Sequence, residues 1–523
     1  MESRWLRILL LLAVMALFLG TAPRASSAAE PNIIAEVRAY NTSQQAALID
    51  LQPIGSGVRE NSNRAKKLYA NVAIQPGARF HTMVDISEIV SNVSSRLVDI
   101  QRKSDNGWPR DLSDSTEGQN ELVPNNYGIV GLALLAAWDM SSTGHREGGK
   151  LKISRPNSRL LNAARAAGDA LLAQDPNKLV STDIVFLYAL SKAVGETGTS
   201  RPYYEAGLSG LKEFVKQYPT ADAVSDLYEP TDSGLRQLKI WQMASWVEAA
   251  KLYRTEGSGL SGLGTPSTMN GWADALMAKI CEFQDDAGGF YYLQNNGRSY
   301  VRTAGQAKAV EVLKRFYAYQ NRLALRKGLA YLKGLQFTAT KVDPMCGSFY
   351  WGGETVDGRL TPWNGISLQD QCYGIKAMAY NFQTTWKRRD FYKGTYWGLN
   401  YLIKSMMAKV PDQYEVFVDR MGFTVSGEYA TPRVDRNSEA ICALYFSCKE
   451  GDVIKLGNIT AYNALQVLKA CVGKGTLLGP QLIAADRSRE GDEDEINEYD
   501  IRAILADSVA DRAPINTVLD LLD

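Results

Sequence analysis

Histidine is nearly absent from this chain. Of its 523 residues, only His81 and His145 are histidines, so a metal site built from several histidines is excluded. A Ser-His-Asp site is also disfavoured, because neither histidine stands in a recognisable motif. Any active site must therefore be sought among other residue types.

The sequence also lacks an excess of either charge. Its 58 lysines and arginines balance 57 aspartates and glutamates, which leaves a formal net charge of +1. A nearly neutral chain has no overall field that would attract nucleic acid or an anionic membrane. We therefore expect no nucleic-acid partner, and a polyanion would have to be held by a local patch.

Cysteine is missing from the first half of the chain. All six cysteines lie between Cys281 and Cys471, and their spacing is not that of a zinc site. An even number of cysteines in an exported chain permits disulfides. We expect either structural pairs or buried free thiols.

Long apolar runs are confined to the N-terminus. Arg4 and Arg7 precede an apolar run over residues 8–20, and small residues follow at 26–29. The run is shorter than the roughly 20 residues of a membrane span, so it predicts a secretory signal peptide over residues 1–29. No later stretch is long and apolar enough to span. We expect a mature protein that is secreted, periplasmic or at the cell surface.

One amphipathic helix recurs along the chain. Its copies are apolar at i, i+3, i+4 and i+7 and end in glutamine. The copies end at Gln101, Gln174, Gln217, Gln284 and Gln336. Between them lies a second, more uniformly apolar helix, as is typical of a helix surrounded by others. The alternation predicts an all-α fold, an α/α toroid of about six inner and six to seven outer helices with β-hairpin insertions at one end.

The toroid is expected to make up most of the chain. The inner helices are predicted to surround one axis near residues 127–140, 184–195, 240–254, 306–319, 372–383 and 437–448. We place the toroid domain at residues 84–475. A segment of unclear structure precedes it at 30–83, and an acidic linker with a helical tail follows at 476–523.

Several links from outer to inner helices are long and hairpin-like. They join aromatic or β-branched runs through glycine-containing turns. In a toroid such links emerge at one end, here called the rim, and long structured loops on a rigid scaffold often carry function. We therefore expect the binding site at the rim.

Aromatic residues of the rim are expected to stack on sugars, whose flat apolar faces are edged with hydroxyl groups. Packing on the toroid is the alternative for each of them. The expected substrate-binding residues are Trp108, Phe290, Tyr292, Tyr350, Trp351, Trp363, Tyr373 and Arg420. A substrate-binding Trp108 is predicted to be partly exposed in a concave pocket, together with aromatic residues from the links near 290 and 350.

The cations of the rim are mostly arginine, which binds carboxylates through two parallel hydrogen bonds and suits an acidic sugar such as a uronate. Elimination would need the uronate carboxylate neutralised, by arginines or a bound calcium ion, and a base. Hydrolysis would need two carboxylates flanking the bond. The candidate catalytic residues are Arg110, Asp285, Asp286, Glu354, Asp370, Arg433 and Glu439. Salt bridges, turn formation and helix capping are the alternatives.

The stretch "IQRKSDNGWPRDL" resembles the Gln…Gly-Gly-Trp-Pro-Lys motif of family ten pectate lyases, which are exported toroids. The matching positions are Gln101, Gly107, Trp108 and Pro109. Asn106 replaces a glycine and Arg110 replaces the lysine. The resemblance implies calcium and arginine chemistry, although the sequence holds no second Gly-Gly-Trp-Pro segment.

The helical repeat itself resembles the toroids of terpenoid cyclases and prenyltransferases, but no Asp-x-Asp-Asp run is present. Together these patterns favour an exported, monomeric enzyme acting on a polysaccharide or oligosaccharide, with elimination preferred to hydrolysis. A non-catalytic toroid that binds glycan or protein is the second hypothesis. A terpenoid-cyclase-like enzyme is the third, and a cavity lined with acids and arginines would exclude it.

Overall fold

The computed structural model describes residues 83–510, with gaps. The residues left out within this range are 110–111, 113–125, 148–149, 198–199, 228–238, 254–268, 339–345, 364, 383–393, 396, 400, 404–405, 411–413, 418–432, 449–460 and 487–494. The signal peptide expected at residues 1–29 lies outside the described residues. So does nearly all of the segment at 30–83.

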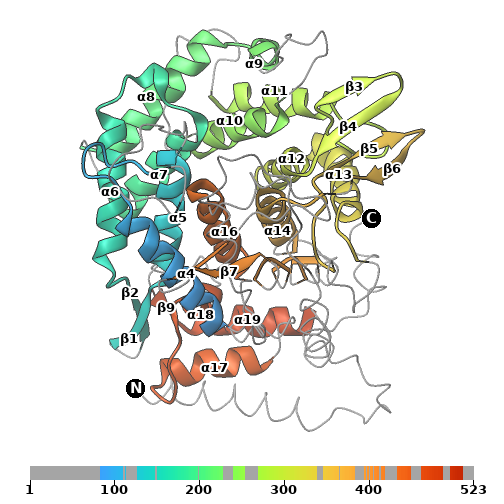
Figure 1. The fold of residues 1–523 in the computed structure, drawn as a ribbon. Helices are drawn as coiled ribbons and strands as arrows, with labels where there is room; N and C mark the ends of the chain where they lie inside the picture. Colours follow the sequence, from blue (N-terminus) through green and yellow to red (C-terminus); the bar gives the residue numbers. More distant parts are fainter. Residues whose placement is uncertain are drawn as a thin grey trace, which may run out of the picture.

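Six helices form a closed ring around one axis (Figure 1). They are α5 (Asn126–Met140), α7 (Ser181–Ala193), α10 (Ile240–Tyr253), α12 (Thr303–Arg315), α14 (Leu368–Phe382) and α16 (Val434–Phe446). Each packs against the next in this order, and α16 packs against α5 to close the ring. These are the six expected inner helices, and the predicted α/α toroid is confirmed.

Small residues let the inner helices approach one another closely. Gly131 of α5 lies against Phe186 of α7, where an added Cβ would stand only 2.4 Å from a ring carbon. Gly128 meets the backbone of Thr182 in the same way, at 2.5 Å. The glycine- and alanine-rich composition of the inner helices therefore sets how tightly the ring closes.

An outer layer packs against the ring. It contains α4 (Met83–Asp99), α6 (Ser158–Leu172), α8 (Pro202–Gln217), α11 (Met269–Glu282) and α13 (Arg322–Gly334). α4 lies against α5 and α16, α6 against α5 and α7, α8 against α7, α11 against α10, and α13 against α12. Residues 394–395, 397–399 and 401–403 are also helical and meet α14, where a Cβ on Gly398 would lie 2.8 Å from Ile375. Most of the apolar core lies between the two layers.

The hairpins expected in the links near residues 290 and 350 are present and join into one sheet, while a third hairpin-like link, over residues 413–433, lies mostly outside the described residues. β3 (Leu293–Asn295), β4 (Arg298–Arg302), β5 (Gly352–Val356) and β6 (Arg359–Pro362) pair in that order, all antiparallel. Both hairpin turns, Asn296-Gly297 and Asp357-Gly358, have positive φ at both residues, the conformation that Asn-Gly and Asp-Gly favour. β7 (Met407–Val410) and β8 (Tyr414–Phe417) form a separate pair.

The C-terminal part of the described chain packs onto the toroid. β9 (Glu495–Ile496) adds a third strand to the hairpin of β1 (Thr143–Glu147) and β2 (Lys150–Ser154). α17 (Ala461–Cys471), which lies within the toroid domain expected at residues 84–475, packs chiefly against α19 (Glu498–Ala510) and β2, while α18 (Gly479–Ala485) lies against α4 and α5. Short helices α9 (Ala221–Leu227), η2 (Pro176–Lys178) and η4 (Tyr319–Asn321) complete the links. Among the helices described, none has the length and apolar character of a membrane crossing.

The repeated glutamines hold the turns that follow the outer helices. The Gln284 side-chain amide donates to the carbonyl of Gly288 in its own turn, at 3.1 Å, and to Ala324 of α13, at 2.8 Å. The same pair of bonds is made by Gln101, to Asn106 and Ala163, and by Gln336, to Gly347 and Gly394. These three of the five repeated glutamines thus each tie one turn to the next outer helix, which gives them a structural role.

Candidate functional site

Trp108, the expected stacking platform, is a core residue. It is 0% exposed, its indole N–H donates to the Leu97 carbonyl at 2.8 Å, and its ring meets Tyr127 edge-on at 6.3 Å. The prediction of a partly exposed Trp108 in a pocket is therefore wrong. Asn106 replaces the motif glycine at a φ of 57°, a left-handed conformation that asparagine tolerates better than most residues. Arg110 lies outside the described residues.

Phe290 occupies an equivalent buried position in a later turn. It is 1% exposed, and its backbone N–H donates to the Gln306 side chain of α12 at 2.7 Å. The other end of the Gln306 amide donates to Gly288 in the same turn, at 3.1 Å. Phe349 and Gln371 of α14 repeat the arrangement. Phe290 therefore packs in the core, and its expected contact with substrate is wrong.

The acidic turn at Asp285 and Asp286 does not fit a calcium site. Asp285 accepts a hydrogen bond from the Gly289 N–H at 2.8 Å, and Asp286 is exposed. Across the described parts of the chain, no group of three or more acidic, histidine or cysteine side chains is placed to hold a metal ion. Asp285 acts in the turn, the alternative that the sequence left open.

Three other catalytic candidates take part in structural interactions. Glu354 on β5 forms an ion pair with Arg298 at 3.4 Å. Asp370 is buried, where it accepts from the Ala304 N–H at the start of α12, at 2.9 Å, and burial raises its pKa to about 6. Arg433 precedes α16 and pairs with Asp435 at 2.8 Å. None of the three lines the cavity described next.

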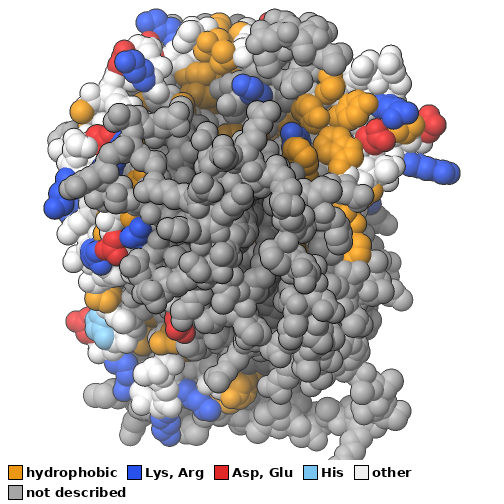
Figure 2. All heavy atoms as spheres, viewed as in Figure 1, with side chains coloured by type: hydrophobic (Ala, Val, Ile, Leu, Met, Phe, Trp, Pro, Cys, Tyr) orange, Lys and Arg blue, Asp and Glu red, His pale blue; other side chains and the backbone are white. Residues whose placement is uncertain are grey.

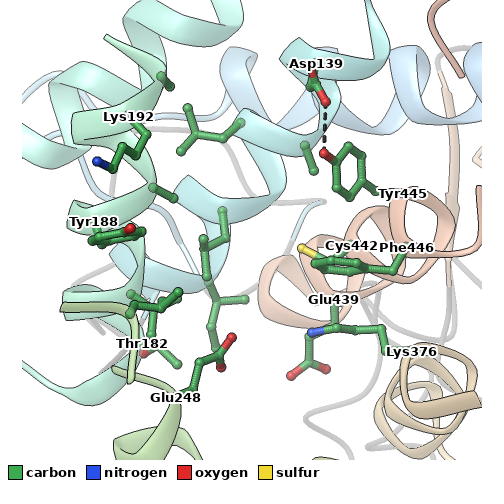
Figure 3. Close-up of a pocket in the computed structure, with 18 of the residues that line it drawn as sticks. Asp139, Thr182, Tyr188, Lys192, Glu248, Lys376, Glu439, Cys442, Tyr445 and Phe446 are labelled. Atoms are coloured by element: carbon green, nitrogen blue, oxygen red, sulfur yellow. Dashed lines mark hydrogen bonds between the residues drawn. The ribbon is translucent and has the colours of Figure 1, made fainter. Parts of the chain in front are cut away.

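A cavity of about 780 Å³ lies inside the ring (Figure 3). All six inner helices contribute side chains to it. It reaches Gly195 just after α7 and Arg155 in the link that follows α5, so it extends to the end of the ring opposite the rim. Of the residues expected in a site, Tyr373 and Glu439 line it. The other aromatic candidates, Tyr292, Tyr350, Trp351 and Trp363, are half-buried at the rim, and Arg420 lies outside the described residues.

The cavity has two contrasting walls. On one side, α5 and α7 present mainly apolar side chains, among them Leu132, Leu135 and Val185. On the other, α10, α12, α14 and α16 contribute the charged residues Glu248, Lys308, Arg315, Lys376 and Glu439. Acids and arginines in the lining meet the criterion that excludes a terpenoid-cyclase-like chamber.

Glu248 forms the centre of a buried ion network. Its two oxygens lie 2.5 Å from Lys308 Nζ and 2.5 Å from an Arg315 nitrogen, and Lys308 also contacts Glu311 at 3.2 Å. Burial alone would raise the pKa of Glu248, but Lys308 and Arg315 outweigh it and bring the pKa down to about 2. Glu248 is therefore ionised at any physiological pH.

Glu439 has the opposite electrostatic environment. It is 7% exposed, and its oxygens accept hydrogen bonds from Gln369 and from Arg436, each at 3.2 Å. Burial raises the pKa of Glu439 to about 7, although Arg436 opposes the rise. Glu439 can therefore give or take a proton near neutral pH.

Lys376 points into the cavity beside both carboxylates. Figure 3 shows Lys376, Glu248 and Glu439 directed toward the same space. The Lys376 ammonium lies 3.9 Å from Glu311, a loose ion pair, and 5.1 Å from the Phe446 ring centroid. Burial would lower the pKa of Lys376, but Glu311 outweighs it and the pKa is raised. Lys376 is thus a protonated cation with aromatic surface beside it.

A second polar group lies where the inner helices end. Asp139 of α5 accepts from the Tyr445 hydroxyl at 2.9 Å, drawn as a dashed line in Figure 3, and from Arg155 at 2.7 Å. Burial raises the pKa of Tyr445 well above its ordinary value. Tyr445 therefore stays protonated.

All six cysteines are free thiols. Four of them are buried, as one of the two expectations has it, and Cys281 and Cys442 are half-buried. Cys372 and Cys442 line the cavity. Burial raises the pKa of Cys442 to about 11, so this thiol is protonated and weakly nucleophilic.

Sequence reasoning missed most of the charged wall. Glu248 stands in "WQMASWVEAAKLY" and Lys308 in "AKAVEVLKRFYAY", both segments expected as inner helices. A charged residue on a helix that is apolar nearly all round must face either a partner or a cavity. That signal is present in the sequence.

No family model and no curated protein sequence matches the chain. Solved structures of unsaturated glucuronyl hydrolases are similar at low level. The enzyme from Streptococcus agalactiae aligns with 10% identity over 76% of this chain and 97% of its own, with a TM-score of 0.47. A hydrolase specific for heparin is 11% identical over 69% of this chain and 96% of its own, with a TM-score of 0.47. The enzyme from Bacillus sp. GL1 is 10% identical over 69% of this chain and 96% of its own, with a TM-score of 0.46. Similarity this low identifies no activity, and the pectate lyase resemblance stays a prediction.

Proposed function

We propose that this chain is a carbohydrate-active enzyme that binds a uronate-containing saccharide in the ring cavity and hydrolyses it, with Glu439 as the proton donor. The observation that carries the proposal is the pairing of two buried carboxyl groups with opposite protonation states in one cavity. Glu248 is ionised, whereas Glu439 holds its proton up to about pH 7. Environments that push two pKa values apart in this way divide acid and base roles.

The balance of charge in the cavity supports an acidic sugar. Among the lining residues that the structure describes, five are cationic and three are carboxylates. The cationic residues are Arg155, Lys192, Lys308, Arg315 and Lys376, and the carboxylates are Asp139, Glu248 and Glu439. A single carboxylate on the ligand would offset much of this excess. Lys376 is best placed to meet it, because its own ion pair is loose and Phe446 shields one side from water.

Each cavity group then has a definable task. Glu439 protonates the glycosidic oxygen as its bond to the anomeric carbon breaks, and the sugar ring develops positive charge. A water molecule then bonds to that carbon and gives up a proton, which restores the Glu439 carboxyl group. Glu248, fixed by Lys308 and Arg315, stabilises that charge electrostatically. The rings of Trp241 and Tyr373, 5.9 Å apart and nearly perpendicular, supply apolar surface for the sugar face.

Hydrolysis is favoured over elimination by the state of the available bases. A base must be unprotonated before it can remove the proton beside the uronate carboxylate. Burial raises the pKa of both Tyr373 and Tyr445 well above the ordinary tyrosine value, and Lys376 is held protonated by Glu311. These tyrosines and this lysine are thus protonated and cannot act as the base.

The test is to incubate the full mature chain with polygalacturonate, alginate, their oligosaccharides and a neutral glucan. We expect new reducing ends from uronate substrates without the ultraviolet absorbance of an unsaturated uronate. Glu439→Gln should lower kcat by about 10²- to 10⁴-fold with little change in binding. Glu354→Gln, on β5 outside the cavity, is the matched control and should keep full activity.

Three results would contradict this proposal. Ultraviolet absorbance that rises with the reducing ends would mean elimination. Calorimetric binding of oligouronates without any turnover would mean a glycan-binding toroid. Full activity of Glu439→Gln would remove Glu439 from the reaction. The signal-peptide pattern at residues 1–29 supports action outside the cytoplasm, which N-terminal sequencing of the exported chain would test.

A further inference from the structure

A cluster of half-buried aromatic residues covers one face of the four-stranded sheet, outside the ring cavity. The ring centroids of Tyr300 and Trp363 lie 6.2 Å apart, and those of Trp363 and Trp351 lie 6.5 Å apart. Figure 2 shows an apolar patch over this sheet, beside the charged tips of its hairpins. None of these residues lines the cavity, so the cluster plays no part in the proposed reaction.

Arg302 lies in the middle of this cluster. Its guanidinium is 4.0 Å from the Trp351 ring centroid and 5.9 Å from that of Tyr292. Within the part of the chain that the structure describes, Arg302 forms no ion pair and no hydrogen bond through its side chain. The carboxylate that acts on it electrostatically, Asp370, already accepts hydrogen bonds from the Ala304 N–H and the Ser367 hydroxyl. The guanidinium therefore presents unused donors beside aromatic rings.

The sheet is built so that these side chains share a face. Tyr300 and Arg302 are two residues apart on β4 and so project to the same side. Arg302 pairs in register with Gly352 of β5, and a Cβ on Gly352 would lie 2.8 Å from the Trp363 ring. The absence of a side chain at Gly352 thus leaves room for the Trp363 ring against this part of β5.

We propose that this surface, formed by Tyr292, Tyr300, Arg302, Trp351 and Trp363 and called the Arg302 face, is a second saccharide-binding site whose ligand is a uronate unit of a polysaccharide chain. Partly exposed rings present flat apolar surfaces on which sugar faces stack. An arginine with free donors adds charge-assisted, two-pronged recognition of a carboxylate. Charge complementarity thus selects an acidic sugar over a neutral one.

The site has a different task from the cavity. The Arg302 face is an open sheet surface at the rim, whereas the cavity is enclosed by the ring and extends to the opposite end. A stacking surface of this kind holds a polymer on the protein without cleaving it. The proposal does not depend on turnover in the cavity.

Binding of the full chain to polygalacturonate, measured by affinity gel electrophoresis, tests the proposal. Arg302→Gln should weaken binding about 10- to 100-fold, the loss of one charged hydrogen-bonded contact. Trp363→Ala should weaken it about 3- to 10-fold. Tyr319→Ala, which removes an aromatic residue that is 76% exposed elsewhere, is the control and should bind like the original chain.

Two further measurements keep the outcome decisive. Arg302→Lys should recover part of the affinity for polygalacturonate if a charge is recognised, and thermal melting checks that each variant is folded. Turnover of a short oligouronate that fills only the cavity should be unchanged in all four variants. Unchanged polymer binding by folded Arg302→Gln would overturn the proposal. So would an equal loss of affinity for a neutral glucan, which would mean that no carboxylate is recognised.

Discussion

At the turns of the rim, the buried amides of Gln306 and Gln371 form their hydrogen bonds with the backbone, whereas buried polar side chains in the cavity face charged groups and open space. Gln306 accepts from the Phe290 N–H and donates to the carbonyls of Gly288 and Gly328. Glu439 is equally buried but accepts from two side chains and lines a void. A neutral group with every bond satisfied has one state, while an ionisable group beside a cavity has two. The difference separates a structural amide from a candidate acid.

Trp108→Ala should have the largest effect on stability, because the tryptophan ring is fully buried. The substitution tests whether the aromatic residues of the rim belong to the core. Deleting this fully buried ring should lower the free energy of unfolding by about 3–5 kcal/mol, as measured by denaturant titration. Activity of the protein that remains folded should not change. Trp363→Ala, which removes a half-buried tryptophan from the same end of the toroid, is the matched control and should cost far less. Equal losses would erase the distinction between packed and exposed rim aromatics.

Lys308→Met should have the second largest effect on stability, because it removes one partner from the buried ion network of the cavity. The variant leaves Glu248 buried with Arg315 as its remaining close partner, and losing one member of a buried pair costs about 3 kcal/mol. Lys216→Met removes an exposed lysine whose partner, Glu213, lies 3.5 Å away, and should cost almost nothing. If both substitutions had the same effect, the Glu248 network would contribute no more than a surface pair.

Gln306→Leu, which removes a neutral amide from a turn of the rim, should lower the stability less than Lys308→Met. The leucine cannot serve the N–H of Phe290 or the two carbonyls that Gln306 binds, and each buried group left without a partner costs about 1–3 kcal/mol. Relaxation of the turn toward water should keep the total near the lower end. The thermal midpoint should fall while turnover in the cavity is retained. Loss of turnover without loss of stability would mean that the turn takes part in the reaction.

The ring could be predicted because its signals are local. Helical periodicity, the alternation of polar-faced and apolar helices, and the glutamine at the end of each outer copy can each be found within a short window. The hairpin turns Asn296-Gly297 and Asp357-Gly358 were visible for the same reason. What the sequence could not supply was the joining of two hairpins into one sheet, because that depends on contacts between distant segments.

The site was predicted only in part. Of the residues expected to form the site, Tyr373 and Glu439 line the cavity. Trp108 and Phe290, expected to bind substrate at the rim, are buried in the core instead. Alternation along a strand would put Phe290 and Tyr292, which are two residues apart, on the same side. In the structure Phe290 precedes β3 and is buried, whereas Tyr292 is half-buried, so the pattern of the strand could not tell them apart. The charged wall is assembled from four inner helices, and its members become neighbours only when α10, α12, α14 and α16, which are separated in the sequence, pack side by side.

The prediction that sharpens the comparison most is the pH dependence that Glu439 imposes on stability. Its pKa is raised from an ordinary 4.5 to about 7 in the folded chain, so between these values the folded state binds a proton that the unfolded state has lost. Stability from this group is therefore fully present below about pH 4.5 and is lost as the pH rises to about 7. Glu439→Gln cannot ionise and should lack this loss, so the unfolding free energy of the variant relative to the original chain should rise across that window and then level off. Neither the Gln306 carboxamide nor the leucine that replaces it can ionise, so Gln306→Leu should change the free energy of unfolding by the same amount at every pH. A Glu439→Gln curve parallel to that of the original chain from pH 4.5 to 8 would show that Glu439 stays ionised, and would remove it as the proton donor.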